Sequence, residues 1–151
     1  MLDSDLLSTA RILAGVRINS KKRLFELIST TFARKSPDLN SREIFESICA
    51  REHLGSTALG NGIAVPHGRI KGTEEVQALF IQLSKPLPFE ADDGKPVDLI
   101  FALIVPSECT GDHKKLLSDI VERFSDTDLL KKLRAAADVN EIWQLLSSSH
   151  A

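Results

Sequence analysis

The chain has 151 residues, enough for one domain with a single sizeable core, and its 42% hydrophobic and 26% charged residues are typical of a globular domain. A net charge of -2 lacks the cationic excess that nucleic-acid or membrane-surface binding needs. We therefore expect one domain over residues 1–151, with no nucleic-acid partner and no direct membrane insertion.

The N-terminus lacks the basic and apolar segments of a signal peptide, and no apolar run is long enough to span a membrane. Cys49 and Cys109 are far apart and form no C-x-x-C motif, which argues against a zinc site or a redox dithiol. The histidines also lack metal-ligand spacing. We expect a cytoplasmic protein with no metal and no cofactor.

Residues 1–19 are mixed in character, and their apolar members predict a short helix over the core: Leu6, Leu7, Ile12 and Leu13. A helix is predicted over 20–34. Ser20 is a favourable N-cap, Arg34-Lys35 would fall in the last turn, and Pro37 follows. Its apolar stripe has helical spacing: Leu24, Leu27, Ile28 and Phe32.

A further helix is predicted from Asn40 to about His53. Asn40 and Glu43 have capping-box spacing, and Gly55 is a suitable left-handed cap. The apolar stripe is Ile44, Phe45, Ile48 and Cys49, so we interpret Cys49 as a small core residue. Arg51 then falls in the last turn of this helix.

The run Ile63-Ala64-Val65 is too short for a helix and contains β-branched residues, so it predicts a strand that Pro66 stops. His67 is then expected at the carboxyl end of the strand, the edge at which α/β folds bind ligands. The chain is expected to turn sharply from Gly68 to Gly72.

Two further strands are predicted. Residues 76–83 form the first, which Pro86 and Pro88 are expected to break. Residues 97–105 are almost continuously apolar, which is typical of a central strand covered on both faces, and Pro106 ends the run.

Three helices are predicted after the strands. The first follows a loop over 107–111 and carries His113 in its first turn, and Asp126 and Asp138 cap the next two. Helices before and after the strands indicate a single α/β domain with a central sheet and helices on both faces. These patterns leave the strand directions open.

His67 and His113 have similar local settings. Each follows a strand that ends in a Val-Pro pair, Val65-Pro66 in one case and Val105-Pro106 in the other. If the two strands are parallel neighbours, both histidines meet at one edge of the sheet.

These residues suit phosphoryl transfer. An imidazole near its pKa of 6.5 is nucleophilic at neutral pH, so His67 is the candidate acceptor. Arg51 would clamp phosphate oxygens, and His113 at a helix N-terminus would add a donor. Ser56 and Thr57 offer hydroxyl groups for the phosphate. Taken singly, His67, His113 and Arg51 are more typical of solvated turns and helix ends than of a site. Asn61-Gly62 in the glycine-rich run equally signals a hairpin turn.

The combination resembles a known family. The stretch over 54–68, LGSTALGNGIAVPHG, resembles the active-site signature of IIA components of the bacterial phosphoenolpyruvate-dependent phosphotransferase system, of the fructose/mannitol class and its nitrogen-regulatory branch. The run VDLIFALIVP over 97–106 resembles the central strand of that family. The resemblance implies a mixed β-sheet flanked by helices on both faces.

The same resemblance implies the roles of three residues. His67 would be phosphorylated on Nε2 by HPr or its nitrogen-branch counterpart. Arg51 matches an arginine that holds the phosphoryl group, and His113 matches the second active-site histidine. No cofactor is implied.

Three functions remain open at this point. In the leading hypothesis the chain is a phosphocarrier whose phosphorylation state regulates partner proteins. The first alternative is a sugar-transport IIA protein that passes the phosphoryl group to a IIB subunit. The second is a binding module that is not phosphorylated.

Overall fold

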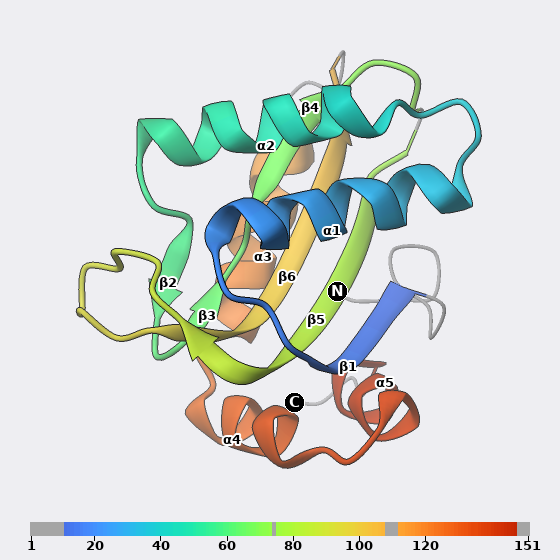
Figure 1. The fold of residues 1–151 in the computed structure, drawn as a ribbon. Helices are drawn as coiled ribbons and strands as arrows, with labels where there is room; N and C mark the ends of the chain where they lie inside the picture. The colour runs from blue at the N-terminus through green and yellow to red at the C-terminus, as the bar shows by residue number, and fades with distance from the viewer. Residues whose placement is uncertain (1–10, 74, 108–111, 148–151) are drawn as a thin grey trace.

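The computed structural model describes residues 11–73, 75–107 and 112–147 as one α/β domain (Figure 1). The strands and helices follow in the order β1 (Ile12–Val16), α1 (Lys21–Lys35), α2 (Ser41–Leu54), β2 (Ala58–Gly60), β3 (Ile63–Ala64), β4 (His67–Ile70), β5 (Gln77–Leu87), β6 (Val97–Pro106), α3 (Asp112–Arg123), α4 (Thr127–Ala135) and α5 (Val139–Ser147).

The strands form one mixed sheet in the order β1-β5-β6-β3-β2, with β4 also paired to β6. β1 is parallel to β5, and β5 is antiparallel to β6. Both β3 and β4 are parallel to β6, which confirms the condition under which the two Val-Pro strands become neighbours. The α/β class and the mixed sheet are therefore as expected.

The helix ends follow from local capping. The side chain of Ser20 accepts a hydrogen bond from the backbone of Arg23, and that of Asn40 accepts one from Glu43. Asp126 caps α4, and Asp138 accepts from the backbone of Glu141 at the start of α5. Each contact satisfies backbone N–H groups that have no partner within the helix, so these caps place the helices where the sequence predicts them.

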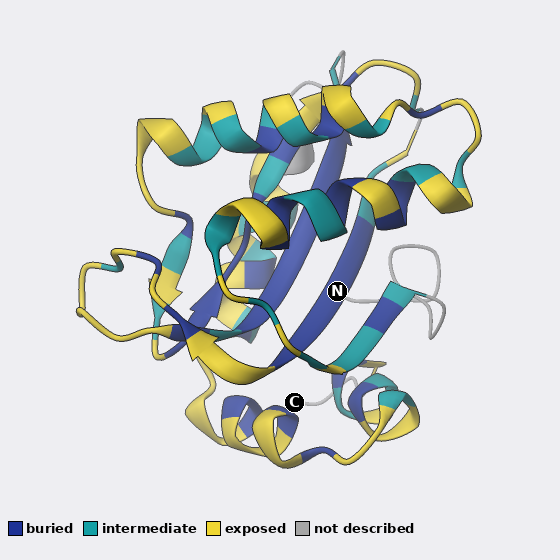
Figure 2. Ribbon diagram, viewed as in Figure 1, coloured by how far each residue is buried: buried dark blue, intermediate teal, exposed yellow. Residues whose placement is uncertain are grey.

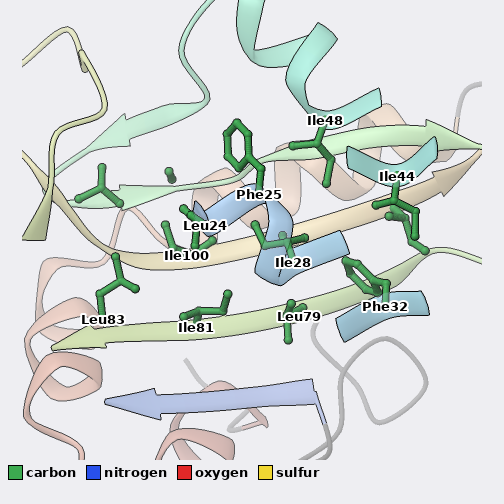
Figure 3. Close-up of a cluster of buried hydrophobic side chains, with 14 of the residues drawn as sticks. Leu24, Phe25, Ile28, Phe32, Ile44, Ile48, Leu79, Ile81, Leu83 and Ile100 are labelled. Carbon is green, nitrogen blue, oxygen red and sulfur yellow. The ribbon is translucent and has the colours of Figure 1, made fainter. Parts of the chain in front are cut away.

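The central strands β5 and β6 are buried along most of their length (Figure 2). α1 and α2 cover one face, and their apolar side chains meet those of β5 and β6 in the cluster shown in Figure 3. α3, α4 and α5 cover the other face, where Phe124 packs against Phe101 with ring centroids 5.3 Å apart. β6 contributes side chains to both clusters, which confirms the prediction of a central strand.

Two predicted details are wrong. Ile12 and Leu13 lie in β1 and not in a helix, because they pair in register with Phe80 and Ile81 of β5. Residues 1–10 lie outside the described residues. The proline at position 86 does not end a strand, since β5 continues to Leu87, and the β5–β6 register becomes irregular over this part.

Among the helices that the structure describes, none combines the length and the apolar character needed to cross a membrane.

Candidate functional site

His67 is the first residue of β4, and its position corrects the sequence prediction. β3 and β4 form one line of backbone along β6, with Ala64 opposite Ile100 and His67 opposite Leu103. Val65 and Pro66 fill the gap between the two strands. His67 therefore follows an interruption within an extended segment, and three further residues of β4 separate it from the strand's carboxyl end.

The face on which His67 lies follows from its register. Residues opposite each other in a parallel pair point to the same side of the sheet, and Leu103 belongs to the cluster that packs against α3. His67 thus points to the α3 face. His113 is the second residue of α3, so the structure brings the helix of His113 to the face of His67. The side chain of His113 and the whole of Cys109 lie outside the described part of the structure.

Gly68 serves close packing and not a turn. It lies within β4, opposite Ile104. A Cβ atom on Gly68 would lie 2.5 Å from Ser47 Oγ, 3.0 Å from Ser47 Cβ and 3.1 Å from the backbone nitrogen of Ile48. The expected sharp turn from Gly68 is therefore wrong, and the missing side chain is what lets α2 approach β4.

The ring of His67 is oriented by a backbone carbonyl. Its Nδ1 lies 2.9 Å from the carbonyl oxygen of Val65. A carbonyl oxygen only accepts hydrogen bonds, so Nδ1 must carry the proton that is donated. In the neutral ring the lone pair then resides on Nε2, which makes Nε2 the nucleophilic atom.

Arg51 lies in the last turns of α2, as predicted, and α2 packs directly on β4. Ser47 contacts both Gly68 and Arg69, and Arg51 follows it by about one helical turn. A guanidinium N–H of Arg51 donates to the carbonyl oxygen of Gly55 at 3.0 Å. The structure thus brings the helix of Arg51 beside the strand of His67 and holds the guanidinium at the α2–β2 connection.

The hydroxyl groups of Ser56 and Thr57 have structural partners. Ser56 donates to the carbonyl of Phe89 at 3.0 Å, and Thr57 donates to Oε1 of Glu52 at 2.6 Å. Each hydroxyl has a single proton, so neither proton is available to a phosphoryl oxygen in this arrangement. In the structure the two hydroxyls hold the α2–β2 connection, and their role in binding phosphate stays a prediction.

Sequence reasoning missed the ion pair between Lys21 and Glu52, whose nitrogen and oxygen atoms are 2.9 Å apart. A signal for it was present. Lys21 opens α1 and Glu52 lies in the last turns of α2, so each charge is placed unfavourably with respect to the dipole of its own helix. Two opposite charges that are both placed unfavourably are expected to form an ion pair, and the structure pairs Lys21 with Glu52.

The sequence signals the turn between β2 and β3, but it does not predict the distant residues that hold this turn. Asn61 and Gly62 have φ of 57° and 84°, which confirms the hairpin reading of this pair. The Asn61 carbonyl accepts from Arg134, which also pairs with Asp98 at 2.9 Å. The backbone N–H groups of Asn61 and Lys95 donate to Asp93 and hold the pKa of that carboxyl below its ordinary value. The long-range contacts of Asn61 with Asp93 and Arg134 hold the start of the segment that leads to His67.

Cys49 packs at the edge of the apolar cluster under α2. Burial, and secondly the charge of Glu52, raise the pKa of its thiol. A raised pKa leaves less of the reactive thiolate, which supports the interpretation of Cys49 as a packing residue.

Comparison with known proteins gives consistent matches. Residues 5–149 match the family model described as phosphoenolpyruvate-dependent sugar phosphotransferase system, EIIA 2. The chain is similar to a nitrogen regulatory protein of Escherichia coli (strain K12), at 42% identity over 135 residues that cover 89% of this chain and 82% of that protein. It is similar to a nitrogen regulatory protein of Bradyrhizobium diazoefficiens at 39% identity, over 95% of this chain and 94% of the relative.

The fold is similar to the crystal structure of nitrogen regulatory protein IIA-Ntr from Neisseria meningitidis. The TM-score is 0.88 at 39% sequence identity, and the match covers 94% of this chain and 97% of that chain. Sequence and structure therefore match over most of both chains.

Proposed function

The chain belongs to the EIIA type 2 family of the phosphoenolpyruvate-dependent sugar phosphotransferase system, as a phosphocarrier of the nitrogen-regulatory kind, and we propose that His67 is the residue that carries the phosphoryl group. The observation that carries the proposal is the hydrogen bond from Nδ1 of His67 to the Val65 carbonyl. It leaves the lone pair on Nε2, on the face that α3 covers.

The proposed step is a transfer between two imidazoles. The Nε2 lone pair of His67 attacks the phosphorus atom of a phosphohistidine on an HPr-like donor. A new N–P bond forms while the donor's N–P bond breaks, and that electron pair returns to the donor's ring. No proton has to move, because Nδ1 of His67 keeps its proton against the Val65 carbonyl. Catalysis then depends on positioning and on stabilising charge on the phosphoryl oxygens.

The family implies a phosphodonor of the HPr type. We propose that the output is regulatory. Phosphorylation adds about two negative charges beside β4, on the α3 face of the sheet, which changes the surface that a partner protein meets. The same proposal places the chain in the cytoplasm, where phosphoenolpyruvate is formed.

The direct test is incubation with phosphoenolpyruvate, enzyme I and an HPr-like carrier. We expect acid-labile, base-stable phosphate on the wild-type chain, as a phosphohistidine requires. Adding a purified IIB subunit then separates the two carrier functions. Loss of the label to IIB would favour sugar transport, whereas phosphorylation-dependent capture of a regulatory protein would favour the regulatory output. Absence of any label would leave the unphosphorylated binding module.

Replacing Arg51 with alanine is expected to slow phosphoryl uptake by about 10²–10³-fold, because a charged donor to the phosphoryl oxygens is lost. His67 should still become labelled at long times. Arg51→Lys keeps the charge but loses the planar guanidinium with its paired donors, so its rate should lie between those of the wild type and Arg51→Ala. Rapid-quench kinetics measures these rates, and a wild-type rate in Arg51→Ala would remove Arg51 from the site.

Replacing His113 with alanine is expected to slow uptake by about 10–10²-fold without abolishing the label, because a proposed donor to the phosphoryl oxygens is lost. His113→Gln retains a donor and should recover part of the rate. The exposed His53, at the end of α2, offers a control, since His53→Ala should leave the rate unchanged. Equal rates for His113→Ala and His53→Ala would contradict the proposed role.

A further inference from the structure

A chain of hydrogen bonds leads from α2 towards the ring of His67. It starts at Glu52, whose Oε1 accepts the hydroxyl proton of Thr57 at 2.6 Å. The backbone N–H of Thr57 also points to this carboxylate, 3.2 Å from Oε1 and 3.3 Å from Oε2. Thr57 is buried, with 5% of its surface exposed. Its side chain and its backbone are therefore both anchored to one carboxylate.

The chain continues through Val65. The carbonyl oxygen of Thr57 accepts the backbone N–H of Val65 at 3.0 Å, and the carbonyl oxygen of Val65 accepts Nδ1–H of His67 at 2.9 Å. Val65 lies in the gap between β3 and β4, outside both strands. Its placement consequently depends on the bond to Thr57 more than that of a residue within a strand ladder.

The carboxylate at the start of the chain is itself held in place. Lys21 Nζ lies 2.9 Å from Oε2 of Glu52, whose side chain is only 8% exposed. The same ammonium group lies 4.6 Å from the ring centroid of Phe89, within the range of a cation–π contact. Glu52 is thus fixed from α1 on one side and presents its other oxygen to Thr57.

We propose that Thr57 and Glu52 are positioning residues for phosphoryl transfer: they hold the Val65 carbonyl where it keeps the proton of His67 on Nδ1. This inference rests on the proposed function of His67. Neither residue touches the phosphoryl group, and both act through the Val65 backbone.

The tautomer matters because it decides which ring nitrogen can attack. A histidine in water favours the tautomer with the proton on Nε2. In that tautomer Nε2 has no lone pair with which to attack the phosphorus atom. The Val65 carbonyl reverses that preference, since a hydrogen bond at one ring nitrogen determines where the proton resides. A Val65 carbonyl that shifts away from Nδ1 would return part of the population to the unreactive tautomer.

Thr57→Val tests this inference, because valine preserves the shape of the side chain and removes the hydroxyl group. We expect phosphoryl uptake to fall by about tenfold, the scale of one hydrogen bond to a charged group. We also expect the unphosphorylated protein to show a mixture of tautomers. The ¹⁵N chemical shifts of the His67 ring at about pH 8, where an ordinary imidazole is neutral, separate the two tautomers.

The matched control is Thr31→Val. Thr31 is also 5% exposed, and its hydroxyl donates to the carbonyl of Leu27 within α1, away from the chain described above. Thr31→Val makes the same chemical change, and it should leave both the His67 tautomer and the rate of phosphoryl uptake unchanged. Thr57→Ser retains the hydroxyl group and should restore both to near wild type.

A wild-type tautomer and rate in folded Thr57→Val would overturn the inference. So would an equal loss of rate in Thr31→Val, which would indicate general destabilisation. If Thr57→Val does not fold, Glu52→Gln decides by the same two measurements, because it weakens the acceptor that Thr57 uses. The tautomer is read without any phosphoryl donor, so a wild-type chain that takes up no phosphate refutes the proposed function and leaves the tautomer result standing.

Discussion

Replacing His67 with alanine is expected to abolish phosphoryl uptake, a loss of at least about 10⁴-fold, because no other group supplies the Nε2 lone pair at this position. The fold should be retained, since the side chain lies at the first residue of β4 and is only partly buried. Labelling with phosphate from phosphoenolpyruvate, followed by base-stable quantification, measures the effect. Circular dichroism verifies the fold.

Two variants make this result specific. His67→Asn keeps an amide N–H near the position of Nδ1, which can donate to the Val65 carbonyl, yet it has no nucleophile at the position of Nε2. It should therefore be as inactive as His67→Ala. His53→Ala removes an exposed histidine and should retain full labelling. Phosphate on His67→Ala at the wild-type level would identify a different acceptor and refute the proposal.

Gly68→Ala is expected to lower the free energy of unfolding by about 1–3 kcal/mol, the usual cost of an overpacked contact. The backbone of Gly68 does not have a positive φ, so the cost comes from packing and not from backbone conformation. The new methyl group would lie 2.5 Å from Ser47 Oγ and 3.1 Å from the backbone nitrogen of Ile48. Urea unfolding gives the change in stability, and we expect slower phosphoryl uptake because β4 must shift.

A double-mutant cycle with Ser47→Ala tests the cause. Removing Ser47 Oγ relieves the shortest contact but also breaks its hydrogen bond of 2.9 Å to the Arg69 carbonyl. Ser47→Ala alone should therefore be mildly destabilising, and the pair Ser47→Ala and Gly68→Ala should lose less stability than the sum of the two. Strict additivity would show that the cost of Gly68→Ala arises elsewhere.

Much of the fold follows from local patterns. The caps at Ser20, Asn40 and Asp126 bond to backbone groups two or three residues away, so the sequence predicts the helix starts closely. The continuous apolarity of residues 97–105 likewise reflects a strand that faces a core on both sides. These features depend on neighbours along the chain or on burial alone.

Other features depend on partners that are distant along the chain. β1 forms because Ile12 and Leu13 pair with the edge of β5, which lies more than 60 residues further along the chain. β5 continues past the proline at position 86 to Leu87, which pairs with Val97 of β6. His67 starts a strand, because the β6 ladder resumes there after the gap at Val65 and Pro66.

The sequence by itself determined the class of fold, the family signature and the identity of His67 as the candidate acceptor. Only the tertiary structure decided what surrounds that histidine. It placed the Val65 carbonyl against Nδ1, anchored Thr57 on Glu52, and made Gly68 a packing position. The physical reason is that motifs record which side chains are present, whereas hydrogen-bond partners and close approaches arise only when α1, α2 and the sheet are packed together.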